Sequence, residues 1–80
     1  MSTIKDKIRK IFISNLNIKK MKYGIKISRQ NLKAWDSQAH INLMMNFEGK
    51  FNISFTYNEL INLDSVEKIE KVIEKKIEKK

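Results

Sequence analysis

Cysteine and proline are absent from this chain of 80 residues, and glycine occurs only at positions 24 and 49. Because there is no cysteine, disulfides, thiolate metal sites and the chemistry of a native thiol are excluded. No run of apolar residues approaches the length needed to cross a bilayer. We therefore expect residues 1–80 to form one domain, whose apolar core is near the lower size limit for folding without disulfides or a structural metal ion.

The first residues also lack the apolar segment of a secretory signal. Residues 1–10 place Lys5, Asp6, Lys7, Arg9 and Lys10 among single isoleucines. A signal peptide would instead contain an uninterrupted apolar stretch after its basic residues. We therefore expect a cytoplasmic protein that does not insert into a membrane.

Positive charge dominates the chain, which has a net charge of +8, but the charge is unevenly distributed. Residues 1–33 contain ten Lys and Arg against Asp6 alone, whereas residues 34–64 contain Lys50 against four acidic residues. Fifteen of the seventeen basic residues are Lys, although bidentate recognition of phosphates and guanine edges favours Arg. The sequence has no Gly-rich RNA motif and no clear helix-turn-helix. A small basic nucleic-acid binder is therefore a secondary alternative.

Apolar spacing predicts a first helix over residues 4–16, with Ser2 or Thr3 as its N-cap. The connection from Asn17 to Asp36 has a looser pattern around Gly24. The alternation of Ile25 and Ile27 within it is also compatible with a short strand, but no partner strand is evident. We interpret it as a structured loop pinned to the core by a set of apolar residues, namely Ile18, Ile25, Ile27 and Leu32.

The second helix is expected over residues 37–50, with Asn52 as a plausible stop. Steps of 100° place its apolar residues on an arc of about 200°, wider than the stripe that a surface helix usually buries. Either part of this arc is left for another contact, or a small bundle surrounds the helix on most sides. The arc comprises Ile41, Leu43, Met44, Met45, Phe47 and Phe51.

Two further helices are predicted from the spacing of a capping box. Thr56 and Glu59 have that spacing before a short helix over residues 57–62, and Asp64 and Glu67 repeat it before the last helix. The last helix has one apolar face, made of Val66, Ile69, Val72, Ile73 and Ile77. The sequence therefore predicts an all-α fold, a small four-helix bundle with a long first loop and a short third helix.

Asp36 and Ser37 open the second helix, directly after Trp35. The dipeptide alone carries little information, because Asp64 and Ser65 repeat it where ordinary N-capping explains it. The longer context resembles the second half of the acyl carrier protein family without gaps, and the first helix lies at the family's usual distance before the serine. The residues that carry the resemblance are Trp35, Asp36, Ser37, Ile41, Leu43, Met45, Phe47, Glu48, Phe51, Ile53, Phe55, Glu59, Leu63, Ser65, Val66 and Ile69.

The resemblance implies an acyl-carrier-like fold in which Ser37, next to Asp36, bears phosphopantetheine derived from coenzyme A. A phosphopantetheinyl transferase would attach this arm with the help of a metal ion. The arm would then carry acyl or aminoacyl groups as thioesters between separate loading and transfer enzymes. The cofactor would supply the sulfur that this chain lacks, and the protein, expected as a monomer, would not itself be an enzyme. A phosphodiester on Ser37 would also lie at the positive end of a helix.

The sequence departs from the family in ways that bear on its partners. Gln38 follows the serine where the family usually has Leu, and the outer positions of the second helix lack the usual carboxylates apart from Glu48. A dedicated partner in a specialised biosynthetic pathway is therefore expected, because basic fatty-acid synthesis enzymes would bind such a surface weakly. The candidate recognition residues are Trp35, Gln38, His40, Met44, Met45 and Glu48.

Structural alternatives exist for several of these candidates. His40 either touches the phosphodiester or a partner, or is a solvated helical histidine, which we favour. Trp35 either covers the base of the arm or fills the gap between loop and core, which we favour. Met44 and Met45 are either adaptable contacts or core residues. An unmodified helical protein-interaction module, in which Asp36 and Ser37 serve only as a cap, is the main alternative function.

Overall fold

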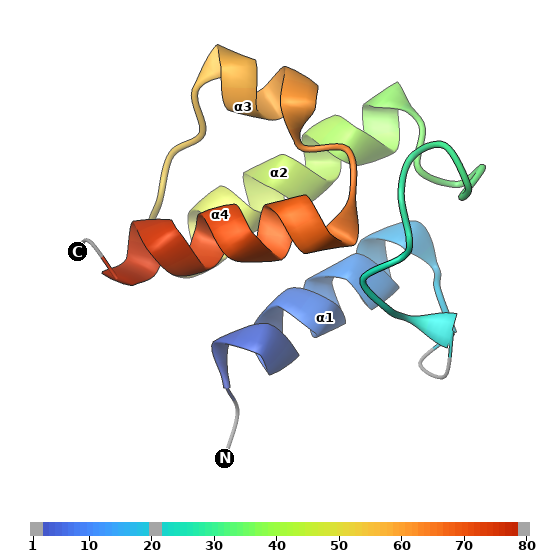
Figure 1. The fold of residues 1–80 in the computed structure, drawn as a ribbon, viewed down its shortest axis with the longest axis horizontal. Coiled ribbons are helices and arrows are strands. Elements are labelled where there is room, and N and C mark those ends of the chain that lie inside the picture. Colours follow the sequence, from blue (N-terminus) through green and yellow to red (C-terminus); the bar gives the residue numbers. More distant parts are fainter. Residues whose placement is uncertain (1–2, 20–21, 79–80) are drawn as a thin grey trace.

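The protein is an all-α structure of four helices with a long first connection and a short third helix (Figure 1). The computed structural model describes residues 3–19 and 22–78. Helix α1 spans Ile4–Leu16, α2 spans Ser37–Phe51, α3 spans Tyr57–Asn62 and α4 spans Val66–Glu78. Within the described residues, none of these helices is long and apolar enough to cross a membrane. The predicted fold class is confirmed.

Local signals in the sequence set most of the helix boundaries. Thr3 forms a capping box with Asp6 at the start of α1, and Thr56 does the same with Glu59 at the start of α3. Helix α1 ends at Asn17, which has the left-handed conformation with φ 55°. Helix α2 ends one residue later than predicted, and Asn52 follows it in the same conformation with φ 54°.

The start of α4 differs from the prediction. Asp64 does not cap this helix, because the backbone N–H of Lys68 donates to the Ser65 hydroxyl at 3.2 Å. The backbone at this point pairs with the first loop, since Ser65 forms an isolated antiparallel bridge with Ser28 and the N–H of Val66 donates to the carbonyl of Ile27. Ser65 takes part in this pairing, and the helix begins only at Val66.

The core forms where α1 packs against α2 and α4. Phe12 lies at its centre, with ring centroids 5.2 Å from Phe47 and 5.6 Å from Trp35, both in edge-on arrangements. In Figure 1, α1 and α3 lie on opposite sides of the α2–α4 pair. The most deeply buried side chains are Trp35, Phe12, Phe47, Ile8, Leu16, Leu43, Met44, Ile69, Ile73 and Val66.

The first connection is attached to the core at several points, as predicted, but not through every predicted residue. Ile18 is buried, and Ile27 and Leu32 are partly buried against the core. The Tyr23 hydroxyl donates to a Glu70 carboxylate oxygen on α4 at 2.7 Å. Ile25 was expected in the core, but it is 55% exposed because residues 24–27 form a turn that directs it outward.

The wide apolar arc of α2 is divided between core and surface. Leu43, Met44 and Phe47 are buried, whereas Ile41 and Met45 are 54% and 63% exposed. The alternative of a bundle that surrounds the helix is therefore wrong for these two residues. They leave an apolar strip on the outer face of α2.

Candidate functional site

The start of α2 holds a serine whose hydroxyl is not used as a helix cap. Asp36 is the N-cap, and its carboxylate accepts a hydrogen bond from the N–H of Ala39 at 2.9 Å. The carbonyl of Asp36 accepts the first intrahelical bond, from the N–H of His40. Ser37 is the first residue within the helix and is exposed. Its hydroxyl therefore faces solvent at the positive end of the helix.

The second Asp-Ser pair of the chain has a different register. Ser65 is itself the cap of α4, because its hydroxyl accepts the N–H of Lys68. Its neighbour Asp64 accepts from the Lys68 ammonium at 3.2 Å. The Ser65 hydroxyl is half-buried and engaged, whereas the Ser37 hydroxyl is exposed. Two identical dipeptides thus place only one serine where a reaction partner can reach it.

Arg29 brings a positive charge next to Ser37. One guanidinium nitrogen, Nη2, donates to the Ser37 hydroxyl at 3.4 Å, across eight residues of sequence. The Arg29 backbone is fixed, because its N–H donates to the carbonyl of Asp64 at 2.9 Å. Asn31 tightens the same turn, accepting the N–H of Ser28 at 2.9 Å and donating to the carbonyl of Lys26 at 2.8 Å. The first loop therefore holds a guanidinium at the start of α2.

Sequence reasoning did not identify Arg29 as part of this site. Its contact with Ser37 depends on the pairing of the first loop with the α3–α4 connection, which no local pattern encodes. The only available signal was composition, because Arg29 is one of two arginines in a chain with fifteen lysines. A guanidinium can contact two phosphate oxygens at once, which an ammonium cannot do.

A buried chain of hydrogen bonds near the start of α2 joins three parts of the protein. The indole Nε1–H of Trp35 donates to Nδ1 of His40 at 3.0 Å. The other ring nitrogen of His40, Nε2, lies 2.7 Å from the carbonyl oxygen of Leu60 in α3. The side chains of Trp35 and His40 are 2% and 6% exposed. The histidine therefore connects the end of the first loop, α2 and α3.

The two partners of His40 determine its protonation. An indole N–H can only donate, so Nδ1 must accept, and the proton of the neutral ring lies on Nε2 and is donated to Leu60. Burial lowers the pKa of His40 below its usual value, and the positive charge of Arg29 acts in the same direction. The hydrogen bond to Leu60 and the negative charge of Asp64 oppose these effects. His40 is therefore neutral at pH 7, since protonation of Nδ1 would break its bond with Trp35.

This arrangement corrects one prediction and agrees with another. His40 is not the solvated histidine that was favoured from the sequence; it is a buried link between helices. Periodicity alone places His40 on the buried face of α2, because it lies three, four and seven residues before Leu43, Met44 and Phe47. Its partners, Trp35 and Leu60, come from other parts of the chain and are supplied only by the fold. Trp35 occupies the gap between loop and core, the interpretation favoured from the sequence.

The other candidate recognition residues are divided by burial. Gln38 is exposed and its amide donates to Asn42 at 3.4 Å, while Met45 is also exposed. Met44 is 1% exposed, so it cannot contact a partner directly. Glu48 accepts the N–H of Phe55 at 2.9 Å and thereby holds the α2–α3 connection. Among these candidates, only Gln38 and Met45 are exposed on the surface, where a partner protein could contact them.

Metal ligands do not gather anywhere in the described part of the chain: residues 3–19 and 22–78 contain no group of three His, Cys, Asp or Glu side chains able to hold an ion. The chain also matches no protein-family model and no curated protein. The interpretation of the site therefore depends on its own geometry.

Proposed function

We propose that this protein is a carrier that bears phosphopantetheine on Ser37 and transports acyl or aminoacyl groups as thioesters. The observation that carries the proposal is the exposed Ser37 hydroxyl at the first position of α2, with the Arg29 guanidinium 3.4 Å away. A nucleophile for phosphoryl transfer needs solvent access and a setting that tolerates an added phosphate. Both conditions are met at Ser37 and not at the half-buried Ser65.

The residues around Ser37 fit a phosphodiester. The amino end of α2 provides a partial positive charge that stabilises an anion. Arg29 adds a full charge and donors suited to phosphate oxygens. The serine hydroxyl takes no part in the helix cap, because the carboxylate of Asp36 satisfies the N–H of Ala39. A phosphate on Ser37 would therefore be held without changes to the helix start.

The attachment is a phosphoryl transfer in which one bond to phosphorus forms and one breaks. The Ser37 oxygen bonds to the phosphorus of coenzyme A that bears the pantetheine, and the bond from that phosphorus to 3′,5′-adenosine diphosphate breaks. The hydroxyl proton goes to a base of the transferase. The bound group supplies a terminal thiol for thioester formation. Arg29 contributes by binding the phosphate oxygens and keeping the base of the arm at the helix start.

The order of elements also supports a carrier. A long first connection, a second helix that begins at the serine and a short third helix are the arrangement that the resemblance to acyl carrier proteins implies. The resulting partners are a phosphopantetheinyl transferase and acyl- or aminoacyl-loading and transfer enzymes. Since the outer face of α2 presents Gln38, Ile41 and Met45 instead of carboxylates, we infer a dedicated partner in a specialised biosynthetic pathway that binds an uncharged helix face.

Mass spectrometry of the intact protein tests the proposal directly. Incubation with coenzyme A, Mg²⁺ and a broad-specificity phosphopantetheinyl transferase is expected to add the mass of one phosphopantetheine group. Ser37→Ala should abolish the addition, and peptide mapping should place it on Ser37. The native transferase should be used in parallel, because Gln38 replaces a residue that often helps transferases dock.

Ser65→Ala is the matched control, because it changes the serine of the other Asp-Ser pair. We expect this variant to be modified as efficiently as the wild type, although loss of the cap lowers its stability by about 1 kcal/mol. If the native transferase adds nothing, or if Ser37→Ala is still modified, the carrier proposal is wrong. The unmodified helical interaction module would then be the better explanation of the fold.

A further inference from the structure

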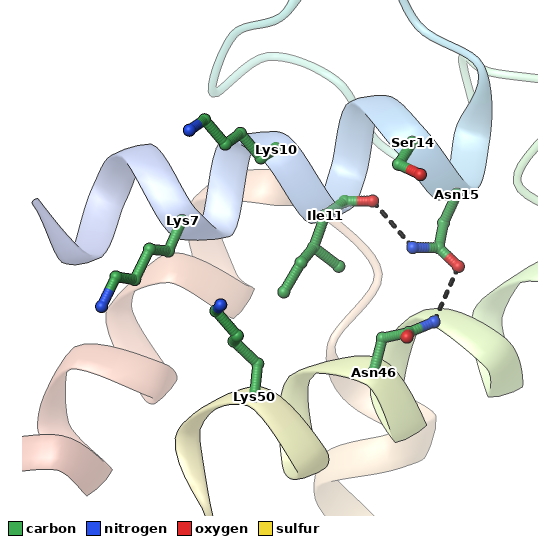
Figure 2. Close-up of a pocket in the computed structure, with 7 residues that line it drawn as sticks. All are labelled: Lys7, Lys10, Ile11, Ser14, Asn15, Asn46 and Lys50. Carbon is green, nitrogen blue, oxygen red and sulfur yellow. Dashed lines mark hydrogen bonds between the residues drawn. The ribbon is translucent and has the colours of Figure 1, made fainter. Parts of the chain in front are cut away.

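A basic groove lies between α1 and the second half of α2, away from Ser37 (Figure 2). Its volume is about 320 Å³. Lys7, Lys10 and Ser14 line it from α1, and Asn46 and Lys50 line it from α2. Figure 2 shows the side chains of Lys7 and Lys50 reaching into the space between the helices, with Ile11 directed into the same space. The groove thus combines an apolar floor with a cationic rim.

A hydrogen-bonded pair of asparagines closes one end of the groove. The side-chain amide of Asn46 donates to the side-chain oxygen Oδ1 of Asn15 at 2.9 Å and to the backbone carbonyl of Asn42 at 2.8 Å. Asn15 in turn donates to the carbonyl of Ile11 at 2.9 Å (Figure 2). Because the bond between Asn46 and Asn15 links the two helices directly, the spacing of the groove walls is set by the fold and not by a ligand.

The described residues that line the groove carry positive charge without a neighbouring acidic group. No carboxylate is among them. Within residues 3–19 and 22–78, no ion pair involves Lys7, Lys10 or Lys50, whereas Arg9, Lys68, Lys71 and Lys76 each pair with an acidic side chain. Like charges on facing helices repel one another. An anionic partner placed between them would remove that repulsion and gain attraction from both sides.

The geometry favours the carboxylates of a polypeptide over a phosphate. Compact phosphates bind best to backbone N–H groups at helix starts and to arginine forks. The groove offers neither, because Lys7 and Lys10 lie within α1 and Lys50 lies in the last turn of α2. Ile11 and the aliphatic parts of the lysine side chains instead form an apolar floor, which suits an apolar side chain flanked by acidic ones.

We propose that this groove is a docking site for an acidic amphipathic segment of a partner protein. The segment would place an apolar side chain over Ile11 and carboxylates beside Lys7 and Lys50. Lys50 lies about 20 Å along α2 from Ser37, since each residue adds 1.5 Å. A partner bound in the groove therefore leaves the start of α2 accessible, and the inference does not depend on modification of Ser37.

Titration of the unmodified ¹⁵N-labelled protein with a synthetic peptide tests this inference. The probe is an 18-residue amphipathic helix with a leucine stripe flanked by glutamates, and its counterpart has glutamine in place of every glutamate. We expect the acidic peptide to shift amide signals of residues that line the groove, including Ile11 and Asn46, and the neutral peptide to shift none. Binding should weaken as the salt concentration rises.

Two double variants of equal charge separate a local site from general attraction. Lys7→Gln/Lys50→Gln is expected to weaken binding roughly five- to tenfold, because each exposed ion pair contributes only modestly. Lys26→Gln/Lys33→Gln changes two exposed lysines of the first loop and should alter binding less than twofold.

Several results would overturn the inference. One is equal weakening in the two double variants, which would indicate general electrostatic attraction. Another is the absence of shifts in the groove at millimolar acidic peptide. A third is tighter binding of inorganic pyrophosphate or of a DNA duplex than of the peptide at the same residues, which would make the groove a phosphate site.

Discussion

Replacement of His40 by alanine removes both bonds of the buried link between Trp35 and Leu60. The indole N–H of Trp35 is then left without its acceptor in a position that is 2% exposed. Loss of a hydrogen bond costs about 1 kcal/mol, and an unsatisfied buried donor costs about 1–3 kcal/mol. We therefore expect His40→Ala to lower the free energy of unfolding by about 2–4 kcal/mol, a large part of the stability of a domain of this size.

Conservative variants separate the two hydrogen bonds. The side-chain oxygen of asparagine occupies a position close to that of Nδ1, so His40→Asn retains an acceptor for Trp35. The terminal nitrogen of glutamine lies close to the position of Nε2, so His40→Gln retains a donor for Leu60. Each is expected to lose about half as much stability as His40→Ala, since each keeps one bond.

Urea unfolding followed by fluorescence is the direct assay, because Trp35 is the only tryptophan of the chain. With a slope of about 1 kcal/mol per M for a small domain, His40→Ala should shift the midpoint by about 2–4 M. The same experiment at several pH values tests the protonation state of the histidine.

The sign of the pH effect follows from the lowered pKa of His40, whose ordinary value is 6.5. The unfolded chain binds the proton more tightly than the folded protein, so this contribution to stability is complete above pH 6.5. It is lost as the pH falls from 6.5 toward the pKa of the folded state. The wild type should therefore lose stability on acidification through this window, and His40→Asn should lose less. A stability of His40→Ala within 0.5 kcal/mol of the wild type, or an equal pH response in His40→Asn, would refute the reasoning.

Three further predictions concern other contacts. Asp36→Ala should lower stability by about 1 kcal/mol in thermal unfolding, because the amino end of α2 loses its cap; no change would mean that the cap is not formed. Tyr23→Phe should lower the free energy of unfolding by about 1 kcal/mol, because the hydrogen bond to Glu70 is lost. Ultraviolet titration of the wild type should show a raised pKa for Tyr23, caused by burial and by the same hydrogen bond. Met44→Ala should lower the free energy of unfolding by about 2–5 kcal/mol, whereas Met45→Ala should lower it by less than about 0.5 kcal/mol. Similar losses in both variants would contradict the division of α2 into a buried and an exposed apolar part.

Helix positions were predictable from the sequence because their signals are local. Thr3 with Asp6 and Thr56 with Glu59 specify helix starts through bonds between residues three apart, and the spacing of isoleucines in α1 specifies its buried face. These interactions lie within one turn and need no knowledge of the fold. Asp64 shows the limit of this approach, since a pairing with the first loop moved the cap to Ser65.

The division of α2 between core and surface was not predictable. Met44 and Met45 are chemically identical neighbours on one wide apolar arc, and periodicity does not say which part of the arc other helices cover. Tertiary packing buries Met44 and leaves Met45 on the surface. His40 is the complementary case, a polar residue that α3 covers and that Trp35 and Leu60 satisfy.

The sequence by itself determined the all-α class, the approximate positions of four helices and Ser37 as the first residue of the second helix. Only the tertiary structure decided what surrounds that serine. Arg29 reaches it because the first loop pairs with the α3–α4 connection, and Lys7 and Lys50 line one groove because α1 packs on α2. Caps and periodic faces are set by neighbours in sequence, whereas these contacts join residues whose proximity exists only after the helices have packed.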